Sequence, residues 1–257
     1  MSKLRVENLT VCFGGLYAVN DVSFETREGE ILSVVGPNGA GKTTLFNAIT
    51  KYVKPTSGKV FFDEKDITSK QIHEISEAGI IRTFQKRSYF PSLTVLENVL
   101  MGQHLTLKPS LVDFVMWKQM QQKNKHAVER AKELLEFVGL GDVRDSVAGL
   151  LPYGKQRLLG VAIALASNPK LLLLDEPCAG SNPNECSSMI GVIEKINETG
   201  IPIILVEHHM KVVMQLSKRV IVINSGKKMV EGTPQEIQCN EEVIEAYLGK
   251  RGKIEHA

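Results

Sequence analysis

The segment from residue 36 to residue 44 carries the residue types that bind phosphate groups. It contains, in order, Gly36, Pro37, Asn38, Gly39, Ala40, Gly41, Lys42, Thr43 and Thr44. Glycines at this spacing let the backbone turn so that its N–H groups face a phosphate. Lys42 is expected to reach the terminal phosphates of a nucleotide, and the Thr43 hydroxyl to bind Mg²⁺. The pattern therefore predicts a site for a nucleoside triphosphate and Mg²⁺.

The flanking residues predict the elements that hold this loop. Residues 31–35 form an apolar run that indicates a buried strand, and residues 44–49 indicate the start of a helix. The helix N-terminus adds partial positive charge beside the phosphates. A glycine-rich turn without function is the alternative, but a strand before the loop and a helix after it are the context that phosphate binding needs.

A pair of carboxylates follows a second apolar run. Residues 171–174 are four leucines, as expected of a parallel strand that is covered on both faces, and Asp175 and Glu176 come directly after them. Beside a phosphate loop, Asp175 is placed to hold Mg²⁺. Glu176 is placed to orient and deprotonate an attacking water. An apolar run that ends in two acidic residues is common, so this interpretation depends on the phosphate loop.

Composition limits the class of protein. The chain has 257 residues, 43% of them hydrophobic, which predicts one large domain or two interlocked subdomains. The net charge of +2 gives no indication of a nucleic-acid partner. The four cysteines have no metal-binding or redox spacing, and the N-terminus has no apolar core of a signal peptide. We therefore expect a soluble cytoplasmic protein.

Turn and cap signals predict further elements. Residues 4–7 and 59–62 alternate as strands do, and residues 96–100 and 127–138 have helical spacing. Asn182, Pro183 and Glu185 have the order of an N-cap, a first helical residue and a capping box. Residues 201–206 indicate another buried strand, and strands at 219–224 and 228–230 flank Ser225 and Gly226 as in a hairpin.

In this order the motifs resemble those of the ATP-binding subunits of ABC transporters, over nearly the full chain: phosphate loop, Gln85, a signature near residue 154, Asp175 with Glu176, then His208. The resemblance implies that Gln85 contacts Mg²⁺ and the attacking water and senses the membrane subunits. It implies that Phe13 stacks on adenine, although a core aromatic is the alternative. His208 matches the histidine that contacts the terminal phosphate, with the neighbouring His209 as a rival.

The signature lies at Pro152, Tyr153, Gly154 and Lys155. In this family the segment opens a helix and touches the terminal phosphate that the other subunit of a dimer holds. The usual form has serine where this chain has Pro152 and glutamine where it has Lys155. Proline removes a hydroxyl and an N–H from the phosphate contact while still suiting a helix start, and Lys155 adds charge near the phosphates. The resemblance therefore implies ATP binding, with a slower hydrolysis rate.

The resemblance also implies the fold: an α/β P-loop ATPase with a mixed-sheet core, an N-terminal antiparallel β subdomain and an inserted α-helical subdomain. We expect one domain over residues 1–257. Residues 1–90 and 156–257 would form the nucleotide-binding core, and residues 91 to about 155 the helical signature subdomain. Residues 179–183 match the family's loop that faces the partner subunit.

Several short sequence segments are similar to those of the ATPase subunits of branched-chain amino acid importers, among them residues 13–16, 82–85, 97–100, 152–154, 179–185 and 246–249. The implied partners are a second ATPase subunit, identical or homologous, two membrane permeases that residues 86–93 would contact, and indirectly a substrate-binding protein. The chain would then lie on the inner face of the membrane. Three alternatives remain: an importer of urea or amides, the ATPase of lipopolysaccharide export, and a weakly hydrolysing regulator. A soluble factor acting on ribosomes or DNA would instead carry tandem cassettes or a long coiled coil.

Overall fold

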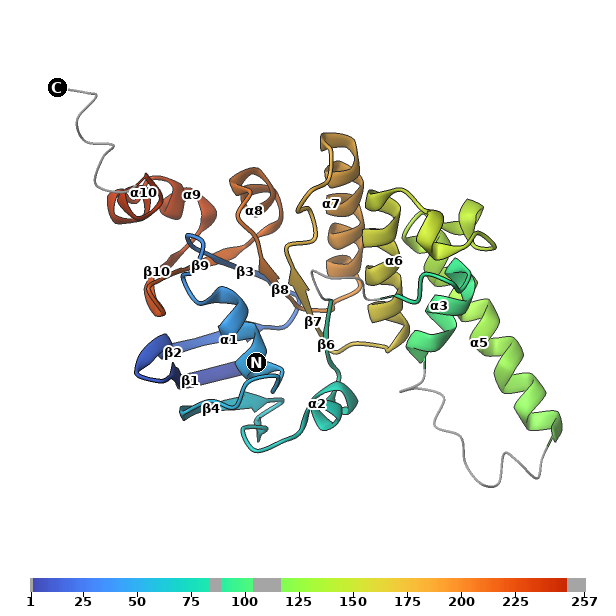
Figure 1. Cartoon of the computed structure of the whole chain (residues 1–257), viewed down its shortest axis with the longest axis horizontal. Coiled ribbons are helices and arrows are strands. Elements are labelled where there is room, and N and C mark those ends of the chain that lie inside the picture. The colour runs from blue at the N-terminus through green and yellow to red at the C-terminus, as the bar shows by residue number, and fades with distance from the viewer. Residues whose placement is uncertain (1, 84–88, 104–116, 249–257) are drawn as a thin grey trace.

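A six-stranded mixed sheet forms the centre of the computed structural model, which describes residues 2–83, 89–103 and 117–248 (Figure 1). The strand order is β10-β9-β3-β8-β7-β6, and β10 runs antiparallel to β9 while the other neighbours are parallel. The strands are β3 (Ile31–Val35), β6 (Ile80–Arg82), β7 (Leu171–Asp175), β8 (Ile203–Val206), β9 (Arg219–Asn224) and β10 (Lys227–Gly232). Every residue of β3, β7 and β8 is buried, because both faces of the sheet are covered.

A four-stranded antiparallel sheet covers one face, with helix α1 (Lys42–Ile49) between the two sheets (Figure 1). Its order is β2-β1-β4-β5, with strands β1 (Ser2–Phe13), β2 (Leu16–Arg27), β4 (Ser57–Phe62) and β5 (Lys65–Asp66). Phe46 of α1 is fully buried in the apolar cluster that joins the sheets. The short helix α2 (Ile72–Ala78) contributes Ile75 to the same cluster.

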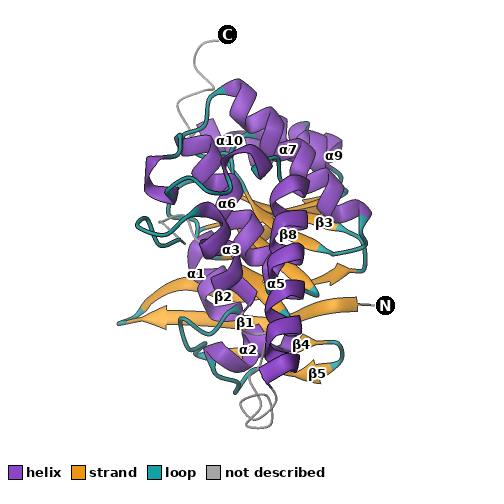
Figure 2. Ribbon diagram, turned by 90° about the vertical axis from the view of Figure 1, so that its right-hand side faces the viewer, coloured by secondary structure: helices purple, strands orange, loops and turns teal. Residues whose placement is uncertain are grey.

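Helices cover the other face, and Figure 2 shows α3, α5 and α6 in front of the strands. The side chains of β7 alternate: Leu172 and Leu174 enter the helical cluster, whereas Leu171 and Leu173 face α1. The helices on this side are α3 (Val95–Gly102), α5 (Trp117–Phe137), α6 (Tyr153–Ala166), α7 (Pro183–Glu198) and α8 (Met210–Leu216). A third cluster joins β3 and β9 to α8, α9 (Pro234–Gln238) and α10 (Glu241–Leu248).

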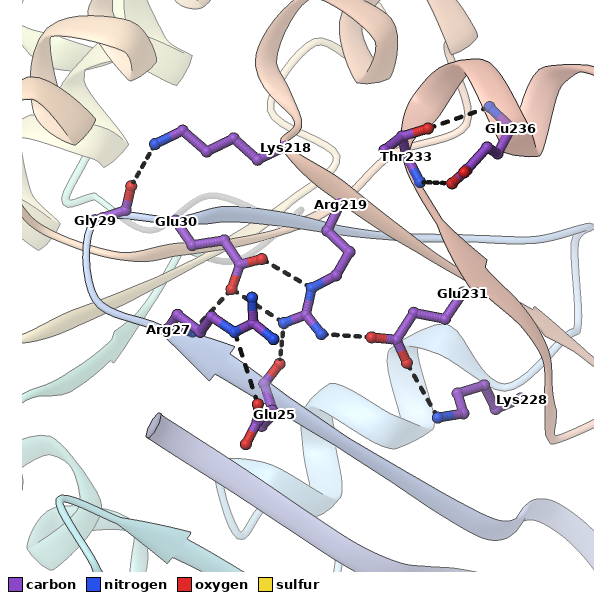
Figure 3. Close-up of polar contacts among 10 residues, drawn as sticks. All are labelled: Glu25, Arg27, Gly29, Glu30, Lys218, Arg219, Lys228, Glu231, Thr233 and Glu236. Carbon is purple, nitrogen blue, oxygen red and sulfur yellow. Dashed lines mark hydrogen bonds and ion pairs between the residues drawn. The ribbon is translucent and has the colours of Figure 1, made fainter. Parts of the chain in front are cut away.

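An ion network ties the two sheets together away from the phosphate loop (Figure 3). The guanidinium of Arg219 on β9 lies 2.8 and 3.0 Å from the two carboxylate oxygens of Glu30, and it also contacts Glu231 and the backbone oxygen of Glu25. These hydrogen bonds to Glu30 are the main reason that the pKa of Arg219 is raised. No helix among the described residues is long and apolar enough to cross a membrane.

The structure confirms the predicted fold class and most of the predicted elements. Asn182 caps α7 with Glu185 in a capping box, and Ser225 and Gly226 form the two-residue hairpin turn, both at positive φ. Helix α1 begins at Lys42 rather than Thr44, because Gly41 already acts as its N-cap. Strand β8 begins at Ile203 rather than residue 201, since Pro202 has no N–H for the ladder.

Candidate nucleotide-binding and catalytic site

The predicted site residues converge on one edge of the central sheet. The phosphate loop follows β3, Asp175 ends β7 with Glu176 directly after it, and His208 follows β8. These three strands are neighbours in the order β3-β8-β7, and they are parallel. Their carboxyl ends therefore meet at the same edge, which is where ligands bind in open α/β sheets.

The phosphate loop needs its glycines because its neighbours leave no room for side chains. A Cβ on Gly36 would lie 2.0 Å from the backbone oxygen of Ile223 on β9. A Cβ on Gly41, whose φ is +104°, would lie 2.2 Å from the backbone oxygen of Ala18 on β2. The N–H of Gly226, in the β9–β10 turn, donates to the oxygen of Ala40 at 2.9 Å. Strands from both sheets thus hold the loop in its curled shape before any phosphate arrives.

Lys42 lies within the loop that it is predicted to serve. Its ammonium donates to the backbone oxygens of Gly36, at 2.6 Å, and Pro37, at 3.0 Å. The residue is buried, and burial lowers the pKa of its ammonium. The negative charges of Glu176 and Asp175 act in the opposite direction. The structure therefore places a buried ammonium within the electrostatic reach of both predicted carboxylates.

Asp175 is buried and has one oxygen engaged. Its Oδ2 lies 2.7 Å from a guanidinium nitrogen of Arg82, at the end of β6. Its Oδ1 is buried and has no hydrogen-bond partner among the described residues. Thr43 is also a predicted Mg²⁺ ligand, and it is exposed in the first turn of α1. An unpartnered carboxylate oxygen and an exposed hydroxyl suit a hard cation such as Mg²⁺.

Glu176 and His208 face one another. Glu176 Oε1 lies 3.9 Å from Nδ1 of His208, and both side chains are partly exposed. His209 instead lies with its Nδ1 3.6 Å from the carboxylate of the buried Glu207. The structure therefore separates the two candidate histidines: His208 lies beside the predicted base, and His209 lies beside a different carboxylate.

The remaining candidates lie on other elements. Phe13 ends β1 opposite Leu16 and is 51% exposed, in the β1–β2 hairpin whose Ala18 approaches the phosphate loop. Its ring is therefore open to a planar ligand. Gln85 lies outside the described residues, so the structure does not place it.

The signature stands at the start of α6, beside the start of α7. Pro152 is the N-cap rather than the first helical residue, and Tyr153 begins the helix. The N–H of Gly154 donates to Glu185 Oε1 at 3.2 Å. The ammonium of Lys155 pairs with Asp142 of the short helix η2 (Gly141–Val143) at 3.1 Å. Lys155 was expected to add charge near the phosphates, but within this chain its charge faces a carboxylate of the helical region.

The sequence interpretation assigned no role to Arg82 or Glu207. Both lie close to residues that it did single out: Arg82 precedes Gln85 by a few positions, and Glu207 directly precedes His208. The available signal was a charged residue at the carboxyl end of a buried strand. Such a residue needs a partner, and the partner of Arg82 is Asp175, a residue on another strand.

Comparison with known proteins decides the family. Residues 19–179 match the family model described as ABC transporter, and residues 227–253 match one described as branched-chain amino acid ATP-binding cassette transporter. The chain belongs to the ABC transporter family. This ABC protein is accordingly an ATPase of the cassette type, and its sheet arrangement is that of the family.

The ABC relatives match nearly the whole chain. The branched-chain amino acid transport ATP-binding protein LivG of Salmonella typhimurium is 42% identical, and BraF of Pseudomonas aeruginosa is 40% identical. Each match covers 96% of this chain and 98% of the relative. A solved ABC cassette in its ADP conformation has a TM-score of 0.85 at 33% identity and covers 97% of this chain and 100% of that one. A dimeric cassette bound to ADP and Pi has a TM-score of 0.77 at 26% identity, covering 90% and 98%.

Proposed function

We propose that this chain is the ATP-hydrolysing subunit of an ABC importer for branched-chain and other hydrophobic amino acids. The observation that carries the chemistry is the convergence of Lys42, Asp175, Glu176 and His208 at the ends of three adjacent strands. The solute follows from the similarity to LivG and BraF, which are named as branched-chain amino acid transport ATP-binding proteins. Importers of urea or amides and lipopolysaccharide export are the alternatives for the solute.

ATP binds through the phosphate loop in this proposal. The backbone N–H groups of residues 36–44 face the phosphates, and the Lys42 ammonium leaves its carbonyl partners to pair with them. Phe13 stacks on the adenine ring. Thr43, Asp175 and Gln85 would hold Mg²⁺, which would neutralise charge on the phosphates. The unpartnered Oδ1 of Asp175 supports this assignment.

Hydrolysis uses the carboxylate of Glu176. Glu176 takes a proton from a water molecule as that water attacks the γ-phosphorus, and the bond to the β-phosphate oxygen breaks to release ADP. Gln85 orients the water, and His208 contacts the γ-phosphate from its position beside Glu176. Glu176 and His208 already lie side by side, so this pair needs little reorganisation when charge develops.

The catalytic unit is a head-to-tail dimer of two cassettes. Each composite site joins the phosphate loop of one chain to the signature of the other, here Pro152, Tyr153, Gly154 and Lys155. The dimeric solved cassette supports this arrangement. We take residues 1–90 and 156–257 as the nucleotide-binding core and residues 91 to about 155 as the helical signature subdomain, and α6 connects the two.

This chain contacts the permeases at the cytoplasmic face of the membrane. The permeases bind a groove of this chain between α2, α3 and α6. The groove has a volume of about 520 Å³, and its exposed apolar residues include Ile72, Phe90 and Met101. Phe90 belongs to residues 86–93, the segment expected to contact the permeases. An apolar groove of this size suits a short amphipathic helix of the partner. A substrate-binding protein then delivers the solute on the other side.

Reconstitution tests the proposal. The chain is co-expressed with the two permeases and any second cassette of its system, and uptake of labelled leucine, urea and a control sugar is measured in vesicles. We expect ATP-dependent uptake of leucine that Glu176→Gln abolishes. Uptake of urea instead of leucine would show that the chain serves a urea importer. Absence of ATP hydrolysis both with and without the permeases would favour the regulatory role.

A further inference from the structure

Glu207 is a fully buried carboxylate that accepts three backbone hydrogen bonds. Its Oε1 accepts from the N–H of Cys178 at 3.1 Å. Its Oε2 accepts from the N–H of His208 at 3.1 Å and from that of His209 at 3.4 Å. Burying a carboxylate is costly unless it is hydrogen-bonded, so these contacts fix both the carboxylate and the segments that donate to it.

The first of these segments is the turn that carries Glu176. The φ of Glu176 is 49°, in the left-handed region that a glutamate rarely adopts. The N–H of Glu176 donates to the backbone oxygen of Val206 at 2.9 Å. Two residues later, Cys178 donates to Glu207. A strained turn persists only when neighbouring residues hold it in place. Here Val206 and Glu207, which are consecutive in the chain, bind the two ends of the turn.

The second segment is the one that carries His208. The same carboxylate accepts the N–H of His208 itself, so one side chain binds the backbone on both sides of the gap between Glu176 and His208. That gap is 3.9 Å between Glu176 Oε1 and His208 Nδ1. The hydrogen bonds of Glu207 go to Cys178, His208 and His209 and not to the phosphate loop, so we treat it as acting through these neighbours rather than on the substrate.

We propose that Glu207 is a positioning residue that sets the distance between Glu176 and His208 in the ATPase site. The inference rests on the roles proposed above for those two residues. A carboxylate is required because both oxygens accept. A glutamine offers one accepting oxygen, and its NH₂ group would face N–H donors on the other side. Glu207→Gln therefore releases either the turn of Glu176 or the backbone of His208.

The test compares Glu207→Gln with a matched control at the opposite end of the same strand pair. Glu30 is also a buried carboxylate, but it precedes β3 and binds Arg219 (Figure 3), whereas Glu207 follows β8. We expect Glu207→Gln to lower kcat about ten- to a hundredfold, the scale of a displacement near 1 Å in a catalytic group, with KM for ATP changed less than about twofold. Glu30→Gln should lower the melting temperature and leave kcat within about twofold.

Histidine side-chain NMR gives a second readout. With His208→Ala to assign the signal, the His208 resonances should shift in Glu207→Gln and stay in place in Glu30→Gln. If Glu207→Gln does not fold, Glu207→Asp replaces it: both oxygens remain but retreat by about one bond length, roughly 1.5 Å, so kcat should fall at least about threefold at unchanged KM. A folded Glu207→Gln or Glu207→Asp with wild-type kcat and unshifted His208 signals would overturn the proposal.

Glu176→Gln separates this inference from the function on which it rests. If Glu176→Gln keeps wild-type turnover, the assigned base is wrong and Glu207 has no catalytic pair to position. If Glu176→Gln is inactive while Glu207→Gln is normal, the proposed function stands and only the positioning role fails.

Discussion

The guanidinium of Arg82 lies 2.7 Å from the carboxylate of Asp175, and both side chains are at least 95% buried, with exposed fractions of 5% and 2%. Arg82 also donates to Asn47 in α1 at 2.6 Å. It therefore joins the proposed magnesium ligand to the helix that follows the phosphate loop. Because Arg82 occupies Oδ2, the other oxygen, Oδ1, is the one left unpartnered and available to a metal ion.

Arg82→Met should be strongly destabilising, because it leaves the carboxylate of Asp175 buried without its cation. Removing one partner of a buried pair typically costs about 3–5 kcal/mol of unfolding free energy. Urea denaturation measures it. The matched control is Arg27→Met, since Arg27 is mostly exposed and pairs with Glu25 at 3.7 Å; such surface pairs are worth about 0–1 kcal/mol. Equal losses in both variants would show that the buried pair has no special role.

Lys42→Ala should abolish tight ATP binding. The substitution removes the ammonium within the phosphate loop, and charge-assisted hydrogen bonds to phosphate are among the strong ones. Calorimetry with Mg²⁺ measures the affinity. Lys51→Ala is the control, because Lys51 lies just beyond the other end of α1 and burial also lowers its pKa. We expect the control to bind ATP normally; unchanged affinity in Lys42→Ala would refute the loop assignment.

Glu176→Gln should bind ATP but hydrolyse it about two to four orders of magnitude more slowly, the usual contribution of a general base. ATP should then hold the variant as a dimer in size-exclusion chromatography. Glu198→Gln, an exposed change at the end of α7, controls for the loss of one negative charge. Wild-type turnover in Glu176→Gln would mean that another residue is the base.

Pro152→Ser should raise the ATPase activity of the purified chain by about ten- to a hundredfold, since a restored hydrogen bond to a charged phosphate is worth roughly 1.5–3 kcal/mol in the transition state. Pro152 is the N-cap of α6 and provides no side-chain cap. A serine can accept the N–H of Lys155 and should also raise stability by about 0.5–2 kcal/mol. Higher stability with flat activity would show that the signature already makes its contact without the serine.

Tyr247 should make stability depend on alkaline pH. The side chain is 38% exposed, and its partial burial, the larger effect, raises the pKa of its hydroxyl above the ordinary value of 10.0, while the backbone of Gly36 acts in the opposite direction. A raised pKa in the folded state gives a stabilising contribution that is complete below the unfolded pKa and is lost as pH rises through the folded one. Above pH 10, urea unfolding should therefore show the free energy of unfolding of wild type falling relative to that of Tyr247→Phe. Tyr17→Phe, on the exposed part of β2, is the control, and a constant difference from Tyr247→Phe would contradict the argument.

Local signals predicted most of what the structure shows. The glycines of the phosphate loop, the cap at Asn182 and the turn at Ser225 depend on neighbouring residues, so the sequence alone was sufficient. The pairing of Arg82 with Asp175 joins residues 93 positions apart and depends on the order of the strands. The pairing of Lys155 with Asp142 depends on how η2 packs against α6. Such contacts are decided by tertiary packing, which a single sequence does not specify.

The left-handed backbone at Glu176 sets function against stability at one position. Asparagine and glycine adopt a φ near 49° more readily than glutamate does, so either would relax the turn. Directed evolution for heat resistance alone would favour replacing the very residue proposed to activate water. Any thermostabilised version of this protein should therefore be selected for ATPase activity as well as for heat resistance. Otherwise the gain in thermal stability will come at the cost of the catalytic base.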